Sequence, residues 1–325
     1  MTPSVRSRLW AAIVAFALGF GVANYGVLVV DGPDRWIWVA VAVVLMLTGA
    51  IGVLLADTAR PVSFWSVLGI EILIVFALVP LLWTVTVATA PPGTTPRDLW
   101  PQQLSGDAFD GAIHSARFRD AAGTSLLVAS LATVIAMPLA ATAAYALVHL
   151  RVRGRRVVYG LVVGSLLLPV VALVGPFAGQ LLALDVHGSR LALVVPTLVV
   201  ALPLAIWLSV TLFRDVPWGL LDAVRADGAT RRQVLSHFVV PQIAPGLGVV
   251  ALLVFVAAAN DFVIGAGVAG DDGQTALPAT LLLATGQVDA SAAIAAAGLL
   301  WLVLPLVLLL AFPRRVTHLL GRSYR

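Results

Sequence analysis

The chain has 325 residues, of which 60% are hydrophobic and only 11% are charged, and its mean hydropathy is +1.01. A soluble globular protein is about half apolar and about a quarter charged, so a water-soluble fold could not bury this much apolar surface. The absence of cysteine excludes disulfides, thiolate catalysis and cysteine-based zinc sites. The composition therefore predicts an all-α membrane protein, because a helix satisfies its own backbone polar groups in lipid.

Eight apolar segments are long enough to cross a hydrocarbon core, which takes about 20 helical residues. They are residues 9–30, 36–56, 63–89, 121–149, 157–182, 190–213, 243–267 and 293–312. The first segment is longer than the apolar part of a signal peptide, and no clear cleavage site follows it, so we interpret it as a span. Prolines such as Pro80, Pro169 and Pro203 interrupt several segments, and we interpret them as packing kinks or, alternatively, as hinges near a translocation path.

The basic residues, all arginines, show how the spans are oriented. Most of them fall in loops on the same side as the N-terminus, whereas the opposite loops are rich in aspartate. The positive-inside rule then places both termini in the cytoplasm, and the sequence pI of about 10.3 reflects topology rather than a nucleic-acid surface. A basic cluster on the inner side, Arg151, Arg153, Arg155 and Arg156, is interpreted as a topology anchor and a contact for anionic membrane lipid.

The loop between the sixth and seventh segments has the periodicity of two short helices. In the first helix, Leu220, Leu221 and Val224 share one face, and Asp227 and Gly228 end it. Thr230 can cap the second helix, in which we expect one face to combine Val234, Leu235 and Phe238 and Pro241 to end the helix before the next span. Such a helix–turn–helix at the membrane surface could be a lever that fits a soluble partner, or a simple connector.

The residues of this loop favour the lever. Asp222-Ala223-Val224, then Asp227-Gly228-Ala229, then Pro241 resemble the signature loop of binding-protein-dependent ABC importer permeases. That family has Glu-Ala-Ala, three residues, Gly, and an apolar stretch ending in Pro. Asp222 replaces the usual Glu and Val224 the second Ala, so the carboxylate is retained with a shorter reach.

From about Phe64 to the C-terminus, the order of several weaker stretches is similar to the carbohydrate-uptake branch of this family and its smaller maltose-transporter permease. The stretches are Leu99-Trp100-Pro101, Ala143-Ala144-Tyr145-Ala146-Leu147, Leu202-Pro203-Leu204-Ala205-Ile206-Trp207 and Ala259-Asn260-Asp261-Phe262. Residues 1–60 fall outside the resemblance. We therefore expect an extra N-terminal hairpin over 1–60 and a six-span permease domain over 61–325.

The resemblance implies the partners and the mechanism. Such a permease sits in a bacterial inner membrane and pairs with a second, related permease. Two ATPase subunits dock on the cytoplasmic loops, and an external binding protein or lipoprotein delivers the solute, here a sugar or related polar molecule. ATP binding moves the loop helix, about Trp218 to Ala229, and switches the bundle between inward- and outward-facing states. ATP and Mg²⁺ belong to the partner ATPase, because this chain has no phosphate-binding Gly-Lys loop, and we expect no enzymatic activity of its own.

Two acidic residues lie in or near spans, and both are candidate functional residues because placing a carboxylate in lipid costs free energy. Asp261, with Asn260 and Phe262, and Trp207 on the preceding span form a possible translocation path, although Asp261 could instead bond to neighbouring helices. Together with Glu71 it suggests a rival function, an ion-coupled secondary transporter. A membrane-embedded enzyme has no support, since no acid, base and nucleophile cluster in any span.

The histidines have no metal-ligand spacing and are expected to be solvated or capping, so no metal site is predicted. They are His114, His149, His187, His237 and His318.

Overall fold

The computed structural model describes residues 14–19, 22, 38, 41–48, 64–94, 103–150, 153–186, 189–216, 224, 226, 228–268 and 290–311. All regular structure within these ranges is helical. The chain divides into two compact units, Met1–Thr86 and Val87–Arg325, which are described separately. The expected division near residue 60 remains a prediction.

The first unit contains most of α3 (Phe64–Ala88), which matches the predicted segment 63–89 and includes Pro80. Its large apolar side chains face outward, for example Leu73 at 67% and Phe76 at 78% exposed. Such a surface fits lipid rather than water. The predicted segments 9–30 and 36–56 lie mostly outside the described residues, and the described parts, 14–19 and 41–48, are helical.

The second unit contains the remaining named elements. They are α4 (Asp107–His114), α5 (Ala116–His149), α6 (Arg155–Ser165), α7 (Val171–Ala183), η1 (Arg190–Leu193), α8 (Val194–Arg214), α10 (Arg231–Gln233), η2 (Val234–Val239), α11 (Val240–Ala259), α12 (Val263–Val268) and α14 (Ala290–Ala311). Within the described residues, four helical stretches are long and apolar enough to cross a membrane: Ala116–His149, Arg190–Arg214, Val234–Ala259 and Ser291–Leu308. The prediction of about eight spans is not confirmed.

The predicted span 157–182 is wrong as a single helix. The structure has two shorter helices, α6 and α7, separated by residues 166–170. Pro169 explains the interruption, because proline has no N–H to donate and disfavours helical backbone in the residue before it. The expected kink is therefore a break.

The predicted span 243–267 is also interrupted. α11 ends at Ala259, and a short second helix, α12, begins at Val263. A carboxylate oxygen of Asp261 lies 3.4 Å from the N–H of Ile264 in the first turn of α12. Asp261 thus acts as an N-terminal cap, a role that favours a new helix start over continuation.

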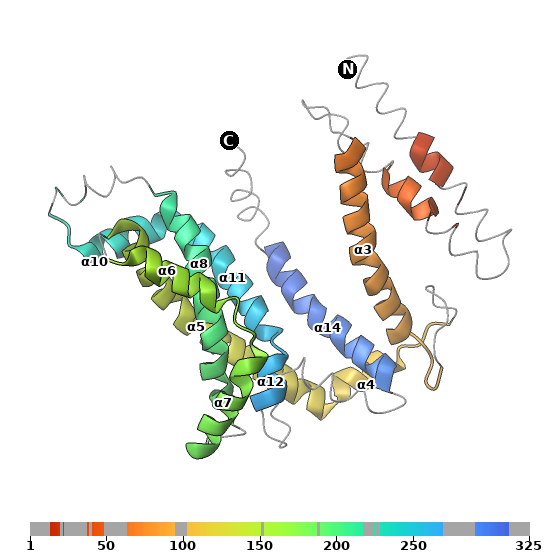
Figure 1. Ribbon diagram of the computed structural model, residues 1–325. Coiled ribbons are helices and arrows are strands. Elements are labelled where there is room, and N and C mark those ends of the chain that lie inside the picture. Colours follow the sequence, from red (N-terminus) through yellow and green to blue (C-terminus); the bar gives the residue numbers. More distant parts are fainter. Residues whose placement is uncertain are drawn as a thin grey trace, which may run out of the picture. The chain divides into compact units, whose positions relative to one another are not determined.

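Three helices, α5, α8 and α11, pack side by side around the main core of this unit (Figure 1). Ala136, Ala140 and Ala144 of α5 are completely buried at a spacing of four residues, and they share this core with Ala201 and Ala205 of α8. Small side chains let two helix backbones approach closely, which is the main source of helix association in lipid. This stripe explains how the alanine-rich α5 packs closely against α8.

A second apolar cluster joins α12 to α7 and η1 through buried residues such as Ile264 and Val268. A side chain added at Gly267 of α12 would overlap Val174 of α7. The close approach of these two helices therefore depends on glycine at position 267.

Candidate functional site

The signature segment turns at Gly228, as the sequence predicts. Gly228 has a φ of +87°, which is left-handed backbone that residues with a Cβ rarely adopt. The N–H of Ala229 lies 3.4 Å from the carbonyl oxygen of Val224 across the turn. Asp222, Ala223 and Asp227 lie outside the described residues.

The second half of the segment begins with a reciprocal cap. The hydroxyl of Thr230 lies 3.4 Å from the N–H of Gln233, and the Gln233 side-chain oxygen accepts from both the N–H of Thr230, at 2.9 Å, and its hydroxyl, at 2.8 Å. This arrangement is a capping box, which satisfies N–H groups at the start of a helix. The predicted cap at Thr230 is confirmed, and its partner Gln233 was not anticipated, although the Thr-x-x-Gln spacing shows it.

The prediction that Pro241 ends this helix is wrong. The helix runs from α10 through the π-helical η2 into α11, and Pro241 lies in the first turn of α11. The N–H of Val240 donates to the carbonyl of Leu235, five residues back. Because proline cannot donate to the carbonyl four residues back and its ring crowds that carbonyl, a wider turn before Pro241 lets the helix continue.

The π-helical turn also changes which side chains are buried. Val234 and Val239, five residues apart, are both completely buried, whereas Phe238 is 43% exposed. The predicted face of Val234, Leu235 and Phe238 assumed α-helical spacing and is wrong for Phe238. Val234 and Val239 belong to the main core, against which Val224 and Ala229 also pack. Both sides of the Gly228 turn are therefore attached to the α5–α8–α11 core.

A buried histidine lies in this same core. His149, the last residue of α5, is 2% exposed, and its Nε2 lies 2.8 Å from the carbonyl oxygen of Phe213 near the end of α8. Nε2 therefore donates to that carbonyl, and the rings of Tyr145 and Phe213 lie 5.7 and 6.4 Å from the His149 ring. Of the two expectations for His149, solvated or capping, the first is wrong, and the bond to a carbonyl in the last turn of α8 fits the second. Its place four residues after Tyr145, on the buried alanine side of α5, is the sequence signal for burial.

The other histidines differ among themselves. His114 is exposed and contacts Asp110, with Nδ1 2.9 Å from the Asp110 carbonyl oxygen, and His237 lies 2.8 Å from the hydroxyl of Ser236. His187 and His318 lie outside the described residues. No group of three or more potential metal ligands occurs among the residues that the structure describes.

The predicted path residues separate into two places. Trp207 lies on α8 and is 40% exposed, while Asn260, Asp261 and Phe262 form the break between α11 and α12. The Asn260 side chain donates to the carbonyl of Val256 at 2.8 Å and accepts from the indole N–H of Trp301 on α14 at 3.3 Å. Trp301 was not predicted to take part. The side chain of Glu71 lies outside the described residues.

These features define a polytopic helical membrane protein in which the segment around Gly228 packs on the core of the main helices. Residues 136–325 match the family model described as "Binding-protein-dependent transport system inner membrane component". The chain belongs to this family and is the permease subunit of an ATP-driven importer.

Individual proteins to which the chain is similar are also transport system permeases. The chain is 31% identical over 262 residues to the trehalose transport system permease protein SugB of Mycobacterium tuberculosis (strain CDC 1551 / Oshkosh), covering 79% of this chain and 95% of SugB. It is 29% identical over 199 residues to the trehalose/maltose transport system permease protein MalG of Thermococcus litoralis, covering 60% and 72%. A chain of a bacterial ABC transporter that imports the acidic polysaccharide alginate has the same fold, with a TM-score of 0.60 at 18% identity over 79% of this chain and 99% of that one.

Family membership confirms the resemblance drawn from residues 222–241. It implies a separate ATPase subunit, a substrate-binding protein and a multi-pass place in the inner membrane. The comparisons give no support to the ion-coupled alternative.

Proposed function

We propose that this permease imports a carbohydrate, as a heterodimer with a second related permease, and that residues 222–241 receive the motion of the ATPase. The observation that supports the coupling role is the attachment of this segment to the main core. Val234 and Val239 anchor one side of the Gly228 turn, and Val224 packs on the other. A displacement of the turn is therefore transmitted to α5, α8 and α11, which form one packed unit. A two-state switch requires such transmission of motion.

In this proposal both termini are cytoplasmic, the ATP and Mg²⁺ sites belong to the ATPase subunits, and this chain catalyses no reaction. Asn260, Asp261, Phe262 and Trp207 contribute to the translocation path. The exposed aromatic rings of Trp207 and Phe262 support a carbohydrate, since flat apolar rings suit the C–H faces of sugars. The named substrates of SugB and MalG make trehalose and maltose the first solutes to test.

Uptake of radiolabelled trehalose and maltose in a strain deleted for this chain tests the function. We expect uptake to be lost, to return with the wild-type chain, and to fail again when the partner ATPase is deleted. Uptake that survives loss of the ATPase but collapses with a protonophore would contradict the proposal and restore the ion-coupled alternative. Trp207→Ala with normal uptake of every carbohydrate tested would remove Trp207 from the path.

A further inference from the structure

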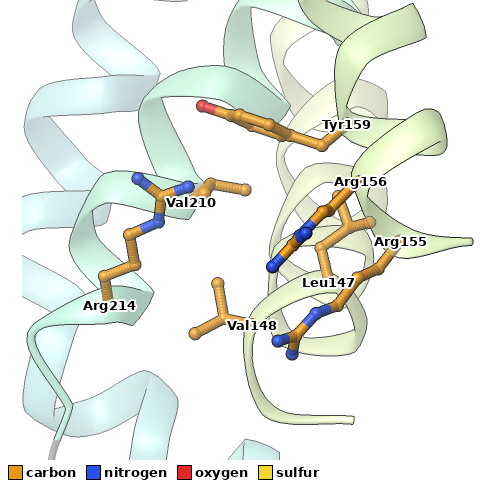
Figure 2. A pocket seen from close by; sticks show the side chains of 7 residues that line it. All are labelled: Leu147, Val148, Arg155, Arg156, Tyr159, Val210 and Arg214. Atoms are coloured by element: carbon orange, nitrogen blue, oxygen red, sulfur yellow. The ribbon is translucent and has the colours of Figure 1, made fainter. Parts of the chain in front are cut away.

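A cavity of about 330 Å³ lies between α5, α6 and α8, and none of the proposed path residues lines it. Three arginines line it: Arg155 and Arg156 from the start of α6, and Arg214 from the end of α8. Figure 2 shows the side chains of Arg156 and Arg214 extending from opposite walls toward the space between the helices. The apolar residues that line it are Leu147, Val148 and Val210.

The positive charge in this cavity has no partner among the described residues. Among the described residues, His114 pairs with Asp110 and Arg190 pairs with Asp120. Neither ion pair involves the three cavity arginines. The guanidinium of Arg214 lies 5.4 Å from the ring centre of Tyr159, which positions it without neutralising it. Three cations that line one cavity, with no ion-paired carboxylate among the described residues, are a favourable place for an anion.

The backbone adds to the same potential. α6 begins at Arg155 after Gly154, which has a φ of +78° and no side chain to cap the helix. The N-terminus of a helix carries partial positive charge and unsatisfied N–H groups, so acidic residues are usual there and arginines are not. Two arginines in this first turn concentrate positive charge where an anion would already be stabilised.

The depth of the cavity indicates the source of the anion. It lies near the ends of two candidate spans, Ala116–His149 and Arg190–Arg214, where we expect the lipid headgroups. Beside it, α6 exposes Val157, Val158 and Leu161, at 67%, 46% and 70%. A soluble phosphate would gain nothing from these apolar side chains, whereas the acyl chains of a phospholipid would cover them.

We propose that this cavity binds the phosphate headgroup of an anionic phospholipid. Because Arg214 is the last residue of α8, directly before the segment leading to the Gly228 turn, a bound lipid fixes the end of α8 from which that turn extends. Lipid composition thereby influences coupling as well as insertion. This inference does not depend on the imported solute.

Native mass spectrometry of the assembled importer, with its partner permease and ATPases, tests the site. The complex is titrated with phosphatidylglycerol and, separately, with phosphatidylcholine. The test variant is Arg156→Gln with Arg214→Gln, and the matched control is Arg117→Gln with Arg119→Gln, which removes the same charge from exposed positions at the other end of α5. Arg156→Lys with Arg214→Lys keeps the charge.

We expect wild type, the control and the lysine variant to retain phosphatidylglycerol selectively. The glutamine test variant should lose about 25-fold in affinity, since an arginine near an anionic surface contributes about a factor of five. Equal retention by the test variant and the control would overturn the proposal, as would displacement of the lipid by inorganic phosphate. No retention on the assembled wild-type importer would also overturn it and would indicate a protein carboxylate in the cavity, from the ATPase or from Asp222 or Asp227.

Discussion

Gly228 shows how one residue determines the shape of the segment that we assign to coupling. Its φ of +87° is accessible to glycine at little cost, while nothing lies within 4 Å of the place a Cβ would take. The requirement at this position is therefore backbone conformation and not lack of space. Valine and asparagine at this position should therefore differ in effect, because they are similar in size but not in their tolerance of left-handed backbone.

We predict that Gly228→Val reduces transport per ATP hydrolysed at least about fivefold, because a β-branched residue in left-handed backbone costs about 1–2 kcal/mol. Gly228→Asn should retain most coupling, since asparagine tolerates this conformation. Transport and ATPase activity are measured together in proteoliposomes, with membrane insertion checked by fractionation. Equal loss in both variants would show that volume or contact with the ATPase, not the turn, is what matters.

His149 joins the ends of α5 and α8 through its hydrogen bond to the carbonyl of Phe213. Replacing it by phenylalanine keeps a ring near Tyr145 and Phe213 but removes the donor to the Phe213 carbonyl. We expect His149→Phe to lower the free energy of unfolding by about 1 kcal/mol, seen as a lower melting temperature in detergent. His114→Phe, at an exposed site, should change stability by less than about 0.5 kcal/mol. An unchanged melting temperature for His149→Phe would mean that the bond contributes nothing net.

The positions of the long helices could be predicted from the sequence, whereas the effect of individual prolines could not. Apolar length predicted α3, α5, α8 and α14 closely, because lipid imposes helix on any long apolar segment. Apolar length failed at Pro169, which breaks the predicted span 157–182. The expectation that proline ends a helix failed at Pro241, which a π-helical turn accommodates. Which outcome occurs depends on neighbouring helices, and these are not encoded in local pattern.

In the candidate site, local features could be predicted from the sequence, but contacts between distant residues could not. The turn at Gly228 and the cap at Thr230 follow from residue type and spacing, so they were predictable. The burial of His149 and the convergence of Arg156 with Arg214 join residues about 60 positions apart in sequence. Only the packing of α5, α6 and α8 brings them together.

The contact of α12 with α7 gives a prediction at the level of helix packing. Gly267→Ala places a methyl group against Val174 and should destabilise the protein by about 1–3 kcal/mol, the usual cost of overpacking. Val174→Ala in the same chain should restore most of that loss. Gly179→Ala on α7, where nothing lies within 4 Å, is the matched control and should not lower the melting temperature, because alanine favours helix over glycine. Failure of Val174→Ala to rescue would contradict the packing assigned to these helices.

The assembled importer provides the strongest test, because the proposed coupling role depends on the ATPase docking at residues 222–241. The absence of native cysteine makes single-site crosslinking direct. Ala226→Cys places a photo-crosslinker on an exposed helical residue beside the Gly228 turn, and Asp110→Cys places the same probe on exposed α4 as the control. We predict a crosslinked product with the ATPase from Ala226→Cys and none from Asp110→Cys. An ATPase product from Asp110→Cys, or none from Ala226→Cys in a complex that still hydrolyses ATP and transports, would contradict the coupling assignment.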